Sequence, residues 1–305
     1  MTESLPALFI PHGGGPCFFM DWGPHYPDDM WESMAVFLRS VSAGLGRIPK
    51  AVLVVSGHWE TARPTVQSVE RNTLLFDYAG FPRHTYELEY PAAGSPQVAE
   101  RVRSCLVSAG FACDIERERG LDHGVFVPFL LIYPDADVPI LQLSLPRGAQ
   151  ASELIALGRA LAPLRREDVL LVGSGMTYHN VAGILGRIPN QAEPAAAFDA
   201  WLGSVLTMSD PEERERALAQ WQSAPFASVC HPTPEHFLPL LVMAGAGEGS
   251  AGTRIYNAPT LGNLQSAFSF ADPGVGAKAW PPQADRMRPT RPGDGDFSLK
   301  GSSDA

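Results

Sequence analysis

The sequence predicts an α/β fold, a single domain in which helices flank a central sheet that is mixed or largely parallel. Apolar runs rich in β-branched residues alternate with amphipathic stretches over most of the 305 residues, and this alternation is typical of α/β domains. A chain of this length is long enough for one large domain or two small ones. After residue 270 the sequence becomes rich in Pro, Gly, Ser and Asp. We therefore expect a folded domain over residues 1–270 and a disordered tail over residues 271–305.

Four apolar runs predict the strands of the sheet. The run AVLVVS at 51–56 is continuous and rich in β-branched residues, as expected for a strand that is covered on both faces. The other predicted strands are residues 5–10, 138–145 and 168–175.

Helices are predicted between and after these strands from their amphipathic spacing. The stretch at 95–110 opens with Ser95, a preferred N-cap residue, and has Pro96 at the first helical position. Pro239 places the start of another helix, through LPLLVMAG, close to itself, because proline is excluded from helix interiors. The remaining predicted helices are residues 31–45, 151–164, 193–208 and 210–221.

Composition excludes several classes of partner. The net charge of −10, from 33 acidic and 23 basic residues, argues against a nucleic-acid partner, because phosphate binding requires a concentrated basic surface. No apolar run reaches the roughly 18 residues of a membrane span, and no signal peptide is recognisable. The cysteines are scattered without a C-x-x-C pair: Cys17, Cys105, Cys113 and Cys230. We interpret them as reduced thiols and expect a cytoplasmic protein without a membrane partner.

Five of the eight histidines lie in loops rich in glycine or proline, near predicted strand ends or a helix start. They are His12, His58, His123, His179 and His236. Ligands of open α/β sheets gather at the carboxyl ends of the strands, so these side chains are expected to converge. Imidazole is the commonest metal ligand in proteins. The sequence therefore predicts a metal or acid–base site at the strand ends. His25 and His84 are interpreted as structural or surface residues, and His231 is a weak candidate that could cap a turn.

The motif HGGGP at residues 12–16 has other interpretations. Its three glycines permit positive φ angles and leave His12 uncovered. A dinucleotide-binding fingerprint fails because Phe18 stands where the third glycine belongs. His-Gly-Gly-Gly also forms the oxyanion hole of lipases and esterases, but those enzymes need a Gly-x-Ser-x-Gly nucleophile elbow. Ser174 and Ser250 lack its first glycine, so a hydrolase ranks second.

Six motifs taken together resemble one known family. HGGGP, SGHWE, FPRHTYELEYPAAG, LDHGVFVPF, GSGMTYHN and HPTPEHFLPLLVMAGAG occur in that order. The chain from about residue 7 to 270 thereby resembles the class III extradiol ring-cleavage dioxygenases. The branch is the DOPA 4,5-dioxygenase type, related to the catalytic subunit of protocatechuate 4,5-dioxygenase. The resemblance makes residues 1–270 the catalytic domain.

The resemblance implies a non-haem Fe(II) enzyme that opens a catechol ring beside its hydroxyls with both atoms of O₂. It assigns His12, His58 and His236 as metal ligands. It assigns His179 as the acid–base residue, which is also a candidate for an additional ligand, and His123 as a catalytic residue on the O₂ and substrate side. Protocatechuate-type members have a glutamate as the third ligand, so Glu235, beside His236, is the alternative. Zn(II) also suits several imidazoles and could occupy the same site.

Other functions and several details stay open. The same histidines would serve a zinc-dependent hydrolase with a metal-bound water, or a metal or small-molecule binder without turnover. Asp122 is expected to orient a neighbouring side chain rather than to bind the metal. Arg83 is a candidate for binding a substrate carboxylate. Candidate aromatic walls of the pocket are Trp59, Phe81, Tyr86 and Tyr90. A monomer or a small homo-oligomer fits everything in the sequence.

Overall fold

A computed structural model describes residues 4–272 of the chain. Its centre is an eight-stranded mixed sheet in the order β4-β3-β5-β2-β6-β1-β8-β7. The strands are β1 (Ala7–Pro11), β2 (Ala51–Thr61), β3 (Thr65–Gln67), β4 (Asp114–Glu116), β5 (Ile140–Pro146), β6 (Val169–Gly175), β7 (Gly252–Thr260) and β8 (Asn263–Phe270). Strands β5, β2, β6 and β1 pair in parallel, whereas β8 joins β1 antiparallel and forms a hairpin with β7. The α/β fold with a mixed, largely parallel centre is confirmed.

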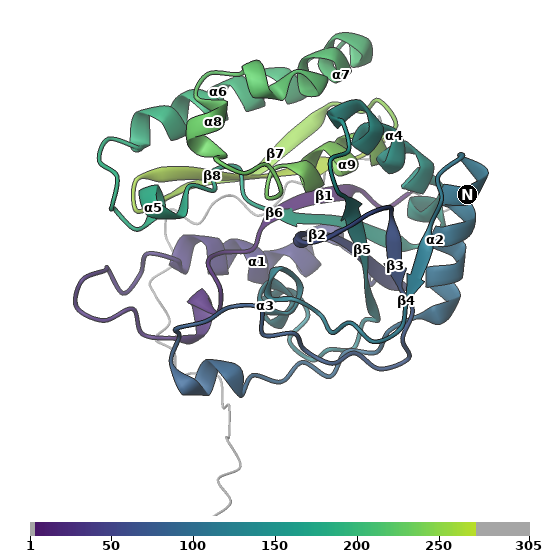
Figure 1. Cartoon of the computed structure of the whole chain (residues 1–305), viewed down its shortest axis with the longest axis horizontal. Coiled ribbons are helices and arrows are strands. Elements are labelled where there is room, and N and C mark those ends of the chain that lie inside the picture. Colours follow the sequence, from purple (N-terminus) through teal and green to yellow (C-terminus); the bar gives the residue numbers. More distant parts are fainter. Residues whose placement is uncertain (1–3, 273–305) are drawn as a thin grey trace, which may run out of the picture.

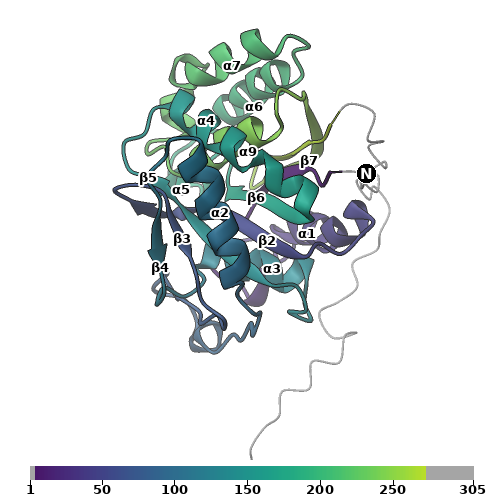
Figure 2. The same ribbon diagram turned by 90° about the vertical axis from the view of Figure 1, so that its right-hand side faces the viewer.

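Helices cover both faces of the parallel centre, as Figures 1 and 2 show, with α4 and α9 on one face and α1 and α3 on the other. This covering explains why β1 and β6 are buried at every residue and read as continuous apolar runs. The α-helices are α1 (Glu32–Leu45), α2 (Pro96–Ser108), α3 (His123–Ile132), α4 (Ala151–Leu161), α5 (Val181–Ile184), α6 (Ala192–Leu206), α7 (Pro211–Ala219), α8 (Ala227–Cys230) and α9 (Leu238–Ala246). Short 3₁₀ helices are η1 (Cys17–Phe19), η2 (Arg83–Tyr86), η3 (Ala162–Glu167) and η4 (Trp221–Ser223).

Local signals in the sequence account for the starts of α2 and α9. Ser95 caps α2 by accepting a hydrogen bond from the backbone N–H of Val98 at 3.3 Å. Pro239 lies in the first turn of α9, so this helix begins where the proline predicted. Helix α3 was not predicted, because Pro128 lies inside it and nine of its ten residues are buried. A helix that is apolar on all sides carries no amphipathic period.

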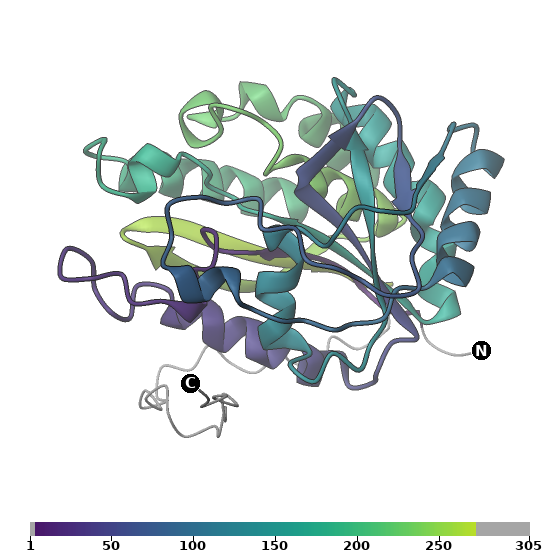
Figure 3. The same cartoon turned by 60° about the horizontal axis from the view of Figure 1, so that its bottom comes forward.

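The connection between β3 and α2, residues 68–95, crosses the molecule in front of α3 (Figure 3). It packs on that helix through Phe76 and Phe126, whose ring centroids lie 5.5 Å apart. Its 3₁₀ helix η2 also reaches the loop after β1, because His84 Nε2 lies 3.0 Å from the carbonyl oxygen of Phe19. The connection therefore brings residues 76–86 beside the carboxyl ends of the central strands.

Both ends of the described chain are fixed to one buried side chain. Arg165 donates hydrogen bonds to the carbonyl oxygens of Leu5 and Ala246 at 2.7 and 2.9 Å, and it pairs with Asp272 at 2.7 Å. Asp272 also accepts from the hydroxyl of Ser4 at 2.5 Å. The expected disordered tail falls, apart from residues 271 and 272, outside the described residues. Within residues 4–272 no helix is long and apolar enough to cross a bilayer.

Candidate metal centre

Five histidines reach the same end of the sheet from five different segments. His12 follows β1 directly, and His179 comes four residues after the end of β6. His58 lies in β2, within an irregularity in the pairing with β5 between Val55 and Glu60. His123 is the first residue of α3, and His236 lies two residues before α9. The parallel pairing of β1, β6 and β2 puts their carboxyl ends at one edge, which is why the histidines converge.

The five rings form one cluster. The ring centroid of His12 lies 4.9 Å from that of His58 and 5.2 Å from that of His236. The Nε2 atoms of His58 and His236 lie 3.1 Å apart. The ring of His123 lies 3.9 Å from that of His58, and the ring of His179 stacks on His236 at 3.3 Å. Two sets of donor atoms each lie within 4.8 Å of one another: His12, His58 and His123, and His179, Glu235 and His236.

Glycines allow the loops to approach this closely. Gly13 and Gly15 in HGGGP have φ angles of 83° and 56°, which other residues rarely adopt. At the end of β6, a Cβ on Gly175 would lie 2.1 Å from the carbonyl oxygen of His236. That position therefore tolerates no side chain while the His236 segment packs against the strand ends.

Asp77, in the connection 68–95, is the functional residue that the sequence reasoning missed. Its Oδ1 accepts hydrogen bonds from Nδ1 and from the backbone N–H of His123, at 2.8 and 3.0 Å. Its Oδ2 lies 3.6 Å from Nδ1 of His58. Burial raises the pKa of Asp77, but the hydrogen bonds from His123 outweigh this effect and lower the pKa to about 2. The only sequence signal is an acidic residue inside the otherwise apolar stretch LLFDYAGF.

Glu235 is the second carboxylate at the cluster. Its Oε1 accepts hydrogen bonds from Nδ1 of His236 at 3.1 Å and from the hydroxyl of Thr233 at 2.8 Å. The same oxygen lies 4.0 Å from Nδ1 of His179. Between the two neighbouring candidates for a ligand, His236 is therefore the one whose Nε2 faces His58, while Glu235 faces the opposite side of the His236 ring.

Burial favours the neutral form of four imidazoles of the cluster. It is the main cause that lowers the pKa of His58 to about 3 and that of His179 to about 4, and the charge of His123 lowers both further. Burial also lowers the pKa values of His12 and His236 well below 6.5. Neutral imidazoles at neutral pH are in the form that binds a metal ion.

The donor set fits a metal ion. Both ring nitrogens of His12 are buried without a hydrogen-bond partner in the described part of the chain. His58 and His236 each turn Nδ1 toward a carboxylate, which favours the proton there and leaves a lone pair on each Nε2. Two lone pairs that face each other at 3.1 Å repel unless a cation lies between them. Ligand nitrogens about 2.1 Å from one metal ion and at right angles lie about 3 Å apart.

A second hydrogen-bond network holds the β2 segment that carries His58. Asp122 is fully buried and accepts hydrogen bonds from Ser56 Oγ at 2.8 Å and from Arg119 Nη2 at 3.1 Å. The same Arg119 nitrogen donates to the carbonyl oxygen of His58 at 3.2 Å. Asp122 thus orients the backbone of the His58 segment, while the partner of His123 is Asp77.

The other histidines lie outside the cluster. His231 is buried among aromatic rings, with Nε2 3.0 Å from the carbonyl oxygen of Thr177. His84 lies against Phe19, and His25 is exposed.

Aromatic side chains line one side of the cluster. The ring of Tyr78 lies 5.7 Å from that of His123, and the rings of Phe81 and Tyr86 lie 5.4 and 5.2 Å from that of Tyr78. The two other aromatic residues predicted to line the pocket contact other groups. Tyr90 is buried and donates to the carbonyl oxygen of Tyr133, and Trp59 lies under the guanidinium of Arg119. Arg83 is exposed and pairs with Glu87.

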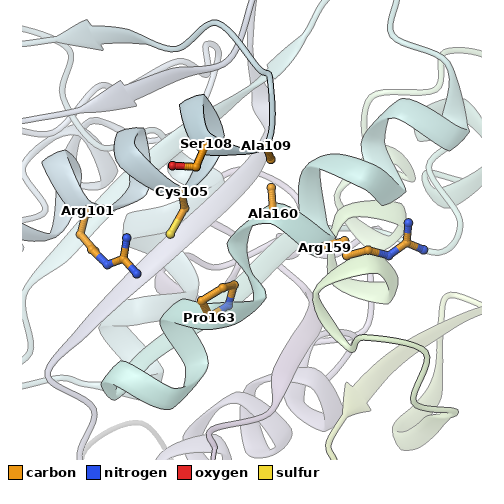
Figure 4. Close-up of a pocket in the computed structure, with 7 residues that line it drawn as sticks. All are labelled: Arg101, Cys105, Ser108, Ala109, Arg159, Ala160 and Pro163. Atoms are coloured by element: carbon orange, nitrogen blue, oxygen red, sulfur yellow. The ribbon is translucent and has the colours of Figure 1, made fainter.

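A surface hollow between α2 and the end of α4 does not belong to this centre (Figure 4). Its two arginines, Arg101 and Arg159, already pair with Glu167 and Glu215 at 2.7 Å. Burial raises the pKa of the Cys105 thiol beside them. The hollow therefore offers neither an unpaired charge nor a thiolate.

Comparisons with known proteins agree with this site. The family model described as "Catalytic LigB subunit of aromatic ring-opening dioxygenase" matches residues 6–269. A 4,5-DOPA dioxygenase extradiol of Beta vulgaris is 43% identical over 211 residues, which cover 68% of this chain and 78% of that protein. The protein of the same name from Escherichia coli K12 is 33% identical over 81% of this chain and 87% of its own length.

A solved structure extends the similarity to the fold. The crystal structure of an uncharacterized protein from Escherichia coli K12 superposes with a TM-score of 0.69 and 28% identity. The superposition covers 88% of this chain and all of that one. The family match runs from before β1 to Ser269 in β8 and includes every histidine of the cluster. The chain belongs to the LigB family of aromatic ring-opening dioxygenases, and it is a class III extradiol ring-cleaving dioxygenase of the DOPA 4,5-dioxygenase type.

Proposed function

We propose that this dioxygenase cleaves its catechol at an Fe(II) ion held by His12, His58 and His236. The observation that carries the proposal is the 3.1 Å approach of the His58 and His236 Nε2 atoms, beside a His12 ring whose two nitrogens have no other partner in the described part of the chain. Three protein ligands leave positions open for a bidentate catechol and for O₂. When bound, the metal lowers the pKa of a catechol hydroxyl and links the ring electronically to O₂.

We assign His179 as the base that takes the second hydroxyl proton of the catechol. Its neutral ring is available for this role, since burial lowers its pKa to about 4. The ring stacks on His236, with the centroids 3.3 Å apart, so a catechol at the metal would lie within reach of its nitrogens. Nδ1 of His179 has no hydrogen-bond partner among residues 4–272, although it lies 4.0 Å from Glu235.

We assign His123 to the side of the site where O₂ meets the catechol ring. Asp77 holds the proton on its Nδ1, so Nε2 is the atom that can accept or return a proton during cleavage. The ring of Tyr78 lies 5.7 Å from that of His123, so aromatic surface begins on this side of the cluster. This arrangement suits a planar aromatic substrate.

The substrate is proposed to be DOPA or a related ortho-diphenol. The support is the printed activity of the relatives from Beta vulgaris and Escherichia coli, together with the aromatic surface formed by Tyr78, Phe81 and Tyr86. The enzyme is further proposed to act in the cytoplasm as a monomer or small homo-oligomer. Four buried, unpaired cysteines suit a reducing compartment.

Anaerobic reconstitution with Fe(II), followed by O₂ uptake and visible absorbance with a panel of catechols that includes DOPA, tests the proposal. One O₂ consumed per catechol with a new yellow product supports it, and His12→Ala should abolish both signals. Zn(II)-loaded protein is the matched control and should consume no O₂. If Fe(II) protein leaves every catechol intact while Zn(II) protein hydrolyses an ester or amide, the histidines serve a hydrolase. If neither form turns over, the site is a binder.

A further inference from the structure

Asp77 occupies a position that the fold fixes tightly relative to α3. The backbone N–H of Leu75 donates to the carbonyl oxygen of Leu121 at 2.8 Å, and the N–H of Leu121 donates to that of Thr73 at 2.8 Å. A Cβ on Gly120 would lie 2.9 Å from the carbonyl oxygen of Thr73, so the two segments approach at backbone distance. The bonds lock the chain two residues before Asp77 to the chain two residues before His123.

The carboxylate of Asp77 bridges two imidazoles that come from different elements. Oδ1 accepts a hydrogen bond from His123 Nδ1 at 2.8 Å, and Oδ2 lies 3.6 Å from His58 Nδ1. An ionised carboxylate only accepts hydrogen bonds, so it favours the tautomer with the proton on Nδ1 in both rings. Each ring then carries its lone pair on Nε2, the nitrogen on the side away from Asp77.

Glu235 does not duplicate this role. Its Oε1 lies 3.1 Å from Nδ1 of His236 and 4.0 Å from Nδ1 of His179. The two carboxylates therefore divide the cluster, with Glu235 on the α9 side and Asp77 on the side of β2 and α3.

A purely structural role for Asp77 makes a different prediction. Oδ1 also accepts from the backbone N–H of His123 at 3.0 Å, at the start of α3, where Asp122 makes no capping bond with its side chain. A carboxylate there stabilises the N-terminus of a helix whatever the histidine rings do. A test must therefore measure which nitrogen of each imidazole carries the proton, and not stability alone.

We infer that Asp77 is a positioning residue that sets the tautomers of the metal ligand His58 and of His123 together, so that both present Nε2 to the metal and substrate. The inference rests on the proposed metal centre and names a residue that the centre needs. In an Asp77→Asn variant, the amide Oδ1 still accepts from the α3 backbone. Its N–H₂ group takes the place of Oδ2 and can donate to Nδ1 of His58, which moves the proton of that imidazole to Nε2 and removes its lone pair from the metal site.

Long-range ¹H–¹⁵N NMR of histidine-labelled, Zn(II)-loaded protein at pH 8 reports the tautomers directly. In the wild type, His58 and His123 are expected to carry their protons on Nδ1. Protons on Nε2 in the wild type would overturn the inference whether or not any variant folds. Because this measurement uses neither catechol nor O₂, an inactive wild type would refute the proposed function without deciding this one.

Zn(II) affinity, measured by chelator competition, is the second readout. Asp77→Asn should weaken binding about 10- to 100-fold, as removal of a partner that orients a metal-bound histidine does. With Fe(II) saturating, kcat should also fall while KM for the catechol changes less. Asp114→Asn, which removes an exposed carboxylate paired with Arg63, is the matched control and should match the wild type. Unchanged tautomers and Zn(II) affinity in Asp77→Asn would leave Asp77 as a helix cap only.

Discussion

The imidazole of His179 stacks on that of His236, with ring centroids 3.3 Å apart and planes only 13° from parallel. A proton on His179 would bring a positive charge into contact with the face of the His236 ring, whose Nε2 faces the proposed metal site. Burial and the neighbouring His123 disfavour that proton and lower the pKa of His179 to about 4. This low pKa supports the proposed role of His179 as a neutral base.

Replacement of His179 tests whether this residue acts as a base or as a metal ligand. His179→Ala should lower kcat by about 10²- to 10⁴-fold, which is the usual contribution of a positioned acid–base group. Its Zn(II) affinity should stay close to that of the wild type, because the proposed ligands remain. Steady-state O₂ uptake and chelator competition give the two values. A collapse of Zn(II) affinity would make His179 an additional ligand instead.

The identity of the third ligand can be read from three variants. His236→Ala should lose more Zn(II) affinity than Glu235→Ala, because the former removes a donor and the latter only the group that orients it. The loss for Glu235→Ala should stay within about 10- to 100-fold. His123→Ala keeps all three proposed ligands and should bind Zn(II) nearly as the wild type does. If His123→Ala loses the metal while His236→Ala keeps it, the triplet His12, His58 and His123 holds the ion.

His231 should make the folded protein sensitive to acid. Burial lowers its pKa to about 3 in the folded state, against about 6.5 in the unfolded chain. The unfolded state therefore binds the proton more tightly, so stability is full above about pH 6.5 and declines as the pH falls toward 3. His231→Gln does not titrate, and its amide can still donate to the Thr177 carbonyl oxygen.

Urea unfolding of metal-free protein at pH 6 and pH 5 measures this effect. Over that interval the wild type should lose roughly 1 kcal/mol of unfolding free energy more than His231→Gln. The other buried histidines titrate in both proteins and cancel in the difference. Parallel pH dependences of the two proteins would contradict the assignment.

Arg165 should be the most costly arginine to replace among those described. Arg165→Met leaves the carbonyl oxygens of Leu5 and Ala246 without their donor and removes the partner of Asp272. The expected loss of unfolding free energy is about 2–4 kcal/mol, because two buried carbonyl oxygens lose their donor. Arg166→Met, which breaks an exposed pair with Glu248, should cost less than about 1 kcal/mol. Equal losses in the two variants would disprove the special role of Arg165.

Local sequence signals were enough for the parallel centre of the fold and for the convergence of the five histidines. The runs at β1, β2, β5 and β6 are apolar because helices cover both faces, and glycines lie next to His12 and His58 and shortly before His179. Strands β3 and β4 have only three residues each, too few to show a period. The β7–β8 hairpin, which joins β1 in antiparallel orientation, was also missed.

Asp77 could not be found from local pattern, for a physical reason. Its importance comes from contacts with His123 and His58, which lie 46 and 19 residues away, and nothing in its own neighbourhood marks it. The pairing of the segments around Leu74 and Leu121, which creates the contact, is an isolated bridge and not a strand. The same holds for the stacking of His179 on His236, which depends on how two separate loops pack.

The place of β1 in the sheet has a consequence for how the enzyme is made. Ala7 pairs with Leu171 on one side and with Phe270 on the other, so both neighbours of the first strand are synthesised long after it. At about 5–20 residues per second, the ribosome needs roughly ten seconds to a minute to supply them. During that interval the apolar segment around Phe9 and Ile10 has no partner strand, and His12 is far from the other histidines. Nascent chains should therefore depend on chaperones until the last strand emerges, and they should acquire their metal only after translation.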